Sequence, residues 1–435
     1  MIRNHLTFST LLKTKIDKKF GKSIKTHKDI ELLQVFILQD TGVHLGFNTL
    51  RRFLGKLKGT KPNAKTLNAI SQYLGYENHI ALDKYRLKDE DWKAWRDVNK
   101  MQSLPRIDQR NINRLMDLKL NNKDYYLFLS TVMKSAIHQR NVEKMNDVLS
   151  ADKLFDLEYQ LILRVSILVS FQFRVLCEEE YLQWSSLARH QSFRSHFAYQ
   201  FVDYSHLNGY YGFLLEKCEY YETQPDEILF LKLMNSYRRF LLGGKLEVVI
   251  QEKISMDIHP TLLGRYYGHR LLTCSDYELD EIFNMTLSSA KNSTSIMSFF
   301  LEIFPQLFLL KRLDYVSKII RYFYERLFDA SEWHHSTEEG IYLLGKSLVD
   351  ISESNFKAAK ASLSLFNISK TSESHQDYYN LFFLLAQYHF EKLNPQPDTV
   401  RMIEIEIEYD EIVTRTGLVS FGGSFMKDYF IDVVR

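Results

Sequence analysis

The stretch that follows Gly46 carries the side chains of this 435-residue chain whose types and spacing are best suited to binding chemistry. If the stretch is helical, one arc of the helix is apolar and is made of Phe47, Leu50, Phe53 and Leu54. The opposite arc is polar and is made of Asn48, Thr49, Arg52 and Lys56, and Arg51 lies between the two arcs. A helix that packs by its apolar arc would therefore present amide, hydroxyl and cationic groups outward.

These outward groups match the chemistry of DNA recognition. Arginine can bond guanine through two hydrogen bonds, asparagine can do the same with adenine, and lysines flanking a groove can contact phosphates. We therefore predict a DNA-binding surface made of Asn48, Thr49, Arg51, Arg52, Lys56, Lys58 and Lys61. The alternative is a solvated helix in a protein-binding domain that has lost affinity for DNA.

Charge is distributed unevenly along the chain. Residues 1–80 contain 14 Lys and Arg against 5 Asp and Glu, a net charge of +9, whereas the remaining residues carry −7. A small basic domain next to a larger acidic region is typical of nucleic-acid binding. A solvated, lysine-rich segment would give the same count.

Helical periodicity predicts the elements that position the basic surface. Apolar residues recur with a helical period over 6–20, 28–39, 47–55 and 63–74, and glycines follow the first, second and fourth of these segments. Segment 28–39 is apolar almost all round, so we expect it to be buried. Asn63 is expected to cap the fourth helix.

Residues 41–76, TGVHLGFNTLRRFLGKLKGTKPNAKTLNAISQYLGY, resemble the helix-turn-helix of Cro and lambda-repressor-like regulators. Thr49-Leu50-Arg51-Arg52 and Thr66-Leu67 match the family's Thr-apolar positions, whereas the turn at His44-Leu45-Gly46 is more apolar than is usual there. The segment 28–39 would be the first helix of this motif, so the resemblance covers about residues 28–76. It implies binding to double-stranded DNA. Because single modules bind weakly, it also implies a homodimer.

Composition favours an all-α chain. Seven prolines and 17 glycines are fewer than the usual ~5% and ~7%, and 30 Phe with 26 Tyr can fill a large core. We predict a helix-turn-helix domain at 1–80, a charged helical connector at 81–122 and an α-solenoid of stacked helical hairpins at 123–435. Trp92 and Trp95 share one face of the connector, either as an aromatic anchor or as a dimer contact.

In the large region, a short polar turn followed by an aromatic or aliphatic residue recurs seven times. The turns are Arg140-Asn141-Val142, Glu179-Glu180-Tyr181, Asn208-Gly209-Tyr210, Gly244-Lys245-Leu246, Ser275-Asp276-Tyr277, Leu313-Asp314-Tyr315 and Ser354-Asn355-Phe356. Their spacing is near that of helical-hairpin repeats, although a non-repetitive helical domain is the alternative. Residues 341–365 resemble a tetratricopeptide repeat, in which Phe356 would plug the hairpin. Residues 403–409 alternate as a strand would, but we expect helix there.

Signs of an enzyme or of a cofactor are weak. No phosphate-binding loop or catalytic motif occurs, and His334 with Glu338, or His335 with Glu339, would supply only two metal ligands. We therefore predict no enzymatic activity, no metal and no cofactor. The three cysteines are widely spaced, and neither a signal peptide nor a membrane-spanning segment is recognisable, so we expect a cytoplasmic protein.

Together these features predict a cytoplasmic, sequence-specific DNA-binding transcription regulator whose repeat domain binds a peptide or protein effector, dimerises, or does both. The alternative is a protein-interaction scaffold or sensor in which the small domain is an adaptor without DNA binding. The Tyr- and Arg-rich stretch 264–270 would suit an exposed interaction surface.

Overall fold

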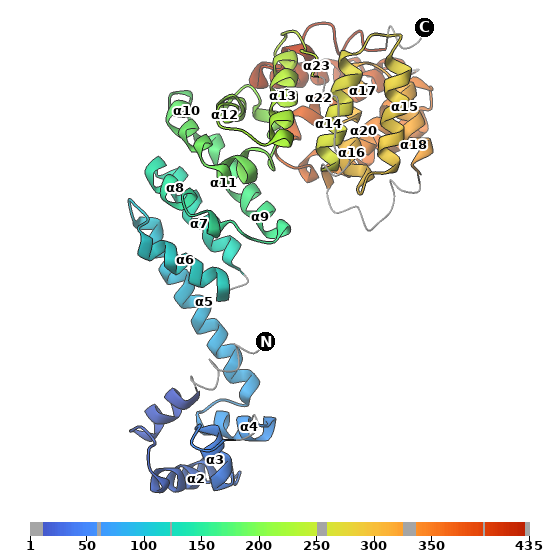
Figure 1. Cartoon of the computed structure of the whole chain (residues 1–435). Coiled ribbons are helices and arrows are strands. Elements are labelled where there is room, and N and C mark those ends of the chain that lie inside the picture. The colour runs from blue at the N-terminus through green and yellow to red at the C-terminus, as the bar shows by residue number, and fades with distance from the viewer. Residues whose placement is uncertain are drawn as a thin grey trace. The chain divides into compact units, whose positions relative to one another are not determined.

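The computed structural model describes residues 12–58, 62–121, 124–249, 259–324, 336–394 and 396–430, and these ranges are helical with no strand (Figure 1). The all-α prediction is therefore confirmed. None of the described helices is both long and apolar enough to cross a membrane.

The chain divides into two compact units, Met1–Ser103 and Leu104–Arg435. The division falls inside the segment 81–122 that the sequence analysis interprets as a connector. Helix α5 (His79–Ser103) ends the first unit, and α6 (Gln109–Asn121) begins the second. Trp92 and Trp95 on α5 are 72% and 36% exposed, whereas Ala94 and Val98 are buried.

The first unit contains a helical segment over residues 12–20, followed by α2 (His27–Thr41), α3 (Phe47–Phe53), α4 (Ala64–Tyr73) and α5. Thr26 and Asp29 form a reciprocal capping box at the start of α2, and the Asn63 side chain caps α4 as expected. Helix α3 ends two residues earlier than predicted. Gly55 adopts φ +77°, and the N–H of Lys56 donates to the carbonyl of Arg51, which closes the last turn.

One core joins the helices of the first unit. Its buried residues include Leu33 and Ile37 of α2, Leu50 and Phe53 of α3, and Ile70 of α4. The expectation that α2 is buried all round is wrong, because only one of its faces packs against this core. The other face exposes Leu32, Val35 and Leu38 by 45%, 46% and 41%.

The second unit continues from α6 through a long series of short helices. They are α7 (Tyr125–His138), α8 (Val142–Leu149), η1 (Asp152–Leu154), α9 (Tyr159–Ser170), η2 (Phe171–Val175), α10 (Glu178–Trp184), η3 (Ser185–Arg189), α11 (Gln191–Phe193), η4 (Arg194–Ala198), η5 (Tyr204–His206), α12 (Tyr210–Cys218), α13 (Pro225–Leu241), α14 (Pro260–Thr273), α15 (Leu279–Lys291), α16 (Ile296–Leu301), α17 (Phe304–Leu309), α18 (Leu313–Tyr322), α20 (Ser336–Ser352), α21 (Phe356–Leu365), η6 (Ile368–Lys370), α22 (Gln376–Leu393), α23 (Thr399–Thr416) and η7 (Val419–Phe421). Residues 403–409 lie within α23, so the preference for helix there is confirmed.

Three tight turns between helices share one backbone geometry. Among the described residues, Arg140, Lys311 and Ser354 are the non-glycine residues with positive φ, at 54°, 58° and 59°. In each turn the next N–H donates to a carbonyl five residues earlier, and the following residue begins α8, α18 or α21. This repeated turn joins helices over only a few residues and fits stacked helical hairpins.

Other predicted turns need correction. Glu179-Glu180-Tyr181 lies inside α10. Gly244 follows the end of α13, but Leu246 begins no helix within residues 245–249. Leu313 already opens α18, so that turn lies about two residues earlier than predicted.

Successive helices pack as neighbours, and further contacts link segments that lie far apart in the sequence. Helix α22 packs against η5, the Tyr429 hydroxyl donates to the Phe308 carbonyl at 2.8 Å, and Ser420 bonds the Phe240 carbonyl. The C-terminal part of the second unit therefore folds back on its middle, in addition to stacking on its immediate neighbours.

The hairpin α20–α21 corresponds to the segment that resembles a tetratricopeptide repeat. Ala359 is buried, but Phe356 is only half-buried and its ring lies 6.2 Å from that of Phe390 on α22. Phe356 therefore does not plug its own hairpin, contrary to expectation. A Cβ atom on Gly345 would contact Val316 and Phe308, so this glycine lets α20 approach the preceding helices.

Candidate functional site

The predicted basic surface lies on and just after α3. Leu50 and Phe53 are buried, whereas Asn48, Arg52, Lys56 and Lys58 are exposed. Thr49 and Arg51 are half-buried. Lys56 follows the end of the helix, so its position depends on the turn at Gly55 and not on helical periodicity. Lys61 lies outside the described residues.

Some of these side chains contact other residues of the chain, and others do not. Arg51 donates to the Asn48 side chain at 3.4 Å, and its guanidinium carbon lies 5.7 Å from the centroid of the Phe47 ring. The Lys56 ammonium group donates to the carbonyl of Lys25. Within the described part of the chain, the Arg52 and Lys58 side chains form neither an ion pair nor a hydrogen bond, and both are available to a ligand.

Sequence analysis missed one basic residue near this surface. A Cβ atom added to Gly55 would lie 3.2 Å from the ammonium nitrogen of Lys13, so Lys13 reaches the end of α3 from the first helical segment. The sequence signal for this residue was the high lysine content of residues 13–28. Only tertiary packing shows which of these lysines approaches α3.

The second unit contains a pocket of about 390 Å³. Its walls come from α9, the segment after η4, α13, α14, α16 and the residue before α22. They are formed by Tyr159, Tyr199, Gln200, Val202, Asp226, Glu227, Phe230, His259, Thr261, Leu262, Arg265, Leu301, Glu302 and His375. A pocket of this size and mixed lining is typical of a binding site for a small ligand or a single side chain.

A buried ion pair forms one wall. Arg265 and Glu302 are 5% and 4% exposed, and their side chains are joined by hydrogen bonds of 2.6 Å and 3.3 Å. The Tyr204 hydroxyl also donates to Glu302. Because buried charges are costly unless paired and hydrogen-bonded, this arrangement holds the two side chains in fixed positions.

Two glycines allow that ion pair to form. A Cβ atom on Gly264 would overlap the carbonyl oxygen of Phe299, and one on Gly268 would lie 3.0 Å from the carbonyl oxygen of Glu302. Helix α14 therefore packs closely against α16 and α17. The interpretation of 264–270 as an exposed surface is wrong, because Arg265, Tyr266 and His269 are buried.

Next to the lining residue Glu227, η4 is a single π-helical turn. Its first residue, Arg194, pairs with Glu222 at 2.9 Å, and Ser195 donates to Glu227 at 2.8 Å. Burial and the neighbouring carboxylate of Glu222 raise the pKa of Glu227 to about 7. The pKa of Glu222 is lowered to about 2, because backbone N–H groups and Arg194 outweigh its burial. These two carboxyl groups therefore share a proton near neutral pH.

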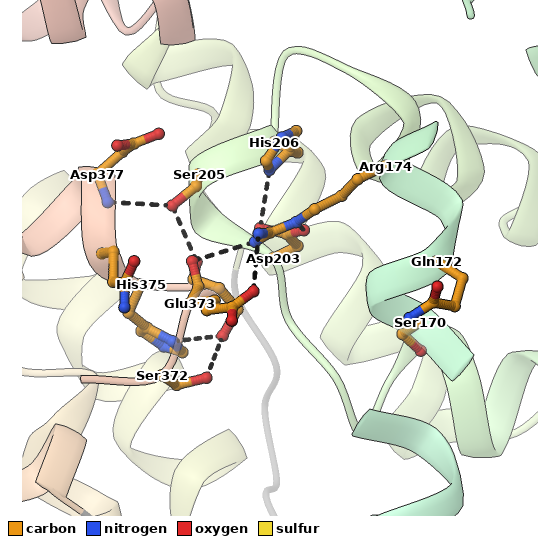
Figure 2. A network of polar contacts seen from close by, with 12 residues as sticks. Ser170, Gln172, Arg174, Asp203, Ser205, His206, Ser372, Glu373, His375 and Asp377 are labelled. Atoms are coloured by element: carbon orange, nitrogen blue, oxygen red, sulfur yellow. Dashed lines mark hydrogen bonds and ion pairs between the residues drawn. The ribbon is translucent and has the colours of Figure 1, made fainter. Parts of the chain in front are cut away.

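A polar network surrounds His375, which is one of the residues that line the pocket (Figure 2). Arg174 donates to both carboxylate oxygens of Asp203 at 2.9 Å and to the carbonyl of Glu373 at 3.1 Å. Ser374 and His375 are hydrogen-bonded at 2.8 Å, and burial lowers the pKa of His375 to about 4. The network fixes the loop before α22, and burial keeps His375 neutral near pH 7.

The sequence analysis considered two histidines as metal ligands, each paired with a glutamate one helical turn away. His334 and His335 lie outside the described residues. Glu338, which is described and belongs to α20, is buried and accepts a hydrogen bond from Ser298. The described residues hold no cluster of three side chains suited to bind a metal.

Comparison with known proteins identifies no relative: no protein-family model, no characterised protein and no solved structure matches this chain. The resemblance to Cro-like regulators therefore depends on the residues and helices described above.

Proposed function

We propose that this chain is a cytoplasmic, sequence-specific DNA-binding transcription regulator. The first unit would contact double-stranded DNA through α3, and the second would bind a peptide or protein effector. The observation that carries the proposal is that Asn48 and Arg52 are exposed on the side of α3 opposite the buried Leu50 and Phe53, and that Lys58 is exposed in the loop that follows. We also propose a homodimer, because one such module contacts too little DNA for tight binding.

The roles of the basic residues follow from their contacts. Arg52 is exposed on the polar arc of α3, and its side chain forms no hydrogen bond or ion pair within the described residues. It is therefore suited to bond a base edge. Lys58, in the loop that follows, is suited to contact a phosphate. Arg51 and Asn48 bond each other, so Asn48 would have to exchange that bond for a base.

Selection from a random duplex library with the full chain tests this proposal directly. We expect one enriched sequence motif, and Arg52→Ala should weaken the base preference at one position of that motif. Lys360→Ala, which removes an exposed lysine of the second unit, is the matched control and should leave the motif unchanged. Failure to enrich any motif at low salt would contradict the proposal.

An adaptor in a protein scaffold is the second candidate, and exposed apolar side chains on the first unit favour it. Leu32, Val35 and Leu38 lie on one face of α2, and Trp92 is also exposed. Apolar patches of this kind often mark protein interfaces. If Val35→Glu abolishes capture of a protein partner, while no DNA motif is enriched by the unaltered chain, the adaptor function is supported instead.

A further inference from the structure

We propose that the pocket of the second unit recognises a cation on an apolar stem, namely the guanidinium or ammonium group of an arginine or lysine side chain or of a free amine of the same shape. This inference deepens the effector-binding part of the proposed function and rests on that part alone. It does not depend on DNA binding by the first unit.

The charge of the pocket lining carries the inference. Three carboxyl groups line the pocket, from Asp226, Glu227 and Glu302, against the single guanidinium group of Arg265. Arg265 is already bonded to Glu302. Asp226 and Glu227 form no ion pair with any side chain in the described ranges, so the lining has an excess of negative charge.

The two histidines of the lining do not offset this excess. Burial lowers the pKa of His375 to about 4, and burial and the nearby Arg265 lower that of His259. Both rings are therefore neutral near pH 7. A ligand that carries a positive charge would offset the excess negative charge of the pocket lining.

Helix α13 offers a simpler explanation for part of this arrangement, since acidic residues are favoured in the first turn of a helix. That explanation suffices for Asp226, which is exposed. It does not account for Glu227, which is half-buried beside the carboxyl group of Glu222 although like charges at close range repel.

Aromatic rings provide the second half of the recognition chemistry. The guanidinium carbon of Arg265 lies 5.1 Å from the centroid of the Phe230 ring, so this wall already accommodates one cation against an aromatic face. Tyr159 and Tyr199 add further ring surface, and Val202, Leu262 and Leu301 provide apolar contacts. An aliphatic stem that ends in a cation would satisfy both kinds of wall.

Binding of such a cation should release a proton. Glu227 is flanked by Glu222, Asp226 and the Ser195 hydroxyl, with Arg194 and Tyr199 bonded to Glu222. A cation favours the ionised form of Glu227, and the pKa of Glu227 is about 7. Affinity should therefore rise roughly tenfold from pH 6 to pH 8, as the carboxyl group loses its proton.

Calorimetric titration of the full chain with two capped amino acids tests the inference. Nα-acetyl-arginine methylamide should bind at least about tenfold more tightly than the citrulline analogue, which has the same shape without the charge. Glu227→Gln should remove most of this preference and flatten the pH dependence. Glu411→Gln, at an exposed glutamate of α23, is the control and should change neither.

Three results would overturn the proposal: equal affinity for the arginine and citrulline compounds, no binding of either at pH 8, or an unchanged pH dependence in Glu227→Gln. Asp226→Asn provides an independent variant if Glu227→Gln does not fold, because Asp226 is exposed and should tolerate the change. It should lower affinity for the arginine compound by a smaller factor.

Two further ligands distinguish the source of the cation. Agmatine is a free amine with a guanidinium group, whereas an arginine-containing tripeptide extends the capped amino acid at both ends. Tighter binding of agmatine identifies a small amine, and tighter binding of the tripeptide identifies a peptide. Selection of DNA by the same preparation is scored separately, so failure of one function is not mistaken for failure of the other.

Discussion

Asn48, Arg52 and Lys58 lie within one short stretch, whereas the pocket brings together side chains as far apart in the sequence as Tyr159 and His375. The α3 surface needs only one buried arc, formed by Leu50 and Phe53, to aim its polar residues outward. The pocket needs close contact between α14 and the helices that follow it, together with a π-helical turn and the loop before α22.

This difference affects how each site responds to substitution. Residues on the α3 surface are exposed and can be changed with little effect on folding. Several pocket residues, among them Arg265 and Glu302, are buried and also stabilise the unit. Substitutions of Arg265 or Glu302 should therefore lower the stability of the second unit, whereas substitutions on α3 should alter binding alone.

The largest effect is expected for Glu302→Ala. The substitution leaves the Arg265 guanidinium buried without its carboxylate partner, which typically costs ~3–5 kcal/mol. Urea unfolding of the full chain should show a lower midpoint for the transition of the second unit. The double variant Arg265→Met with Glu302→Leu should recover most of the loss. An unchanged midpoint in Glu302→Ala would show that the pair is solvated.

Gly264→Ala should have the next largest effect on stability. The added Cβ atom would overlap the Phe299 carbonyl oxygen, so α14 must move, at a cost of ~1–3 kcal/mol or more. Gly46→Ala is the comparison in the first unit: its Cβ atom would lie 3.6 Å from the Thr49 hydroxyl in ordinary contact, so it should cost only the ~0.5–1 kcal/mol expected for alanine at the N-cap of α3. Thermal unfolding should separate the two variants, and equal midpoints would contradict the close packing of α14.

The α3 surface should respond through binding and not through stability. Arg52→Ala should lose ~1–3 kcal/mol of discrimination at one base pair, and Lys58→Ala should weaken binding to all duplexes alike. Fluorescence anisotropy at several salt concentrations should show a salt dependence lower by about one unit of log–log slope for Lys58→Ala. If both isotherms match the unaltered chain, this face is not the DNA surface.

Local signals predicted the elements of the first unit well. The cap at Asn63, the left-handed Gly42 and the buried positions of α3 follow from residues that are neighbours in the sequence. The exposure of Leu32 on α2 did not follow, because it depends on how much of that helix the other helices cover. Hydrophobicity alone does not reveal which faces remain without a partner.

The pocket was not predictable from the same signals. Gly264 and Gly268 mark close approach of two helices, but the intervening Tyr and Arg residues were interpreted as a surface because the partner helix is not visible in the local pattern. Glu222 and Glu227 are close in the sequence, but their pKa values also depend on η4 lying against them, where Ser195 bonds Glu227 and Arg194 pairs with Glu222. Such sites depend on long-range contacts.

Phe356→Ala should have a smaller effect than a plug of the hairpin would suggest. Phe356 is half-buried, so removing its ring should cost ~1–2 kcal/mol, which is a fraction of the value for full burial. Phe308→Ala, at a residue with no exposed surface, should cost ~3–5 kcal/mol. If both substitutions lower the unfolding midpoint equally, Phe356 is more deeply buried than the structure shows. That result would support the prediction that Phe356 plugs its hairpin.

The smallest expected effect is a stabilising one, at the turn that recurs between helices. Ser354 has φ 59°, a conformation that glycine adopts without the steric cost of a Cβ atom, so Ser354→Gly should raise stability by ~0.5–1 kcal/mol. Ser352→Gly is the control two residues earlier, at the end of α20, and should lower stability instead. If Arg140, Lys311 and Ser354 occupy the same turn, glycine at each should give a gain of similar size, less the side-chain contacts that are lost. Arg140 contacts Glu180 and the Val175 carbonyl, and Lys311 donates to the Asp428 carbonyl. A gain at Ser354 together with losses at Lys311 and Arg140 would show that the three turns share a backbone geometry without being equivalent units of a repeat.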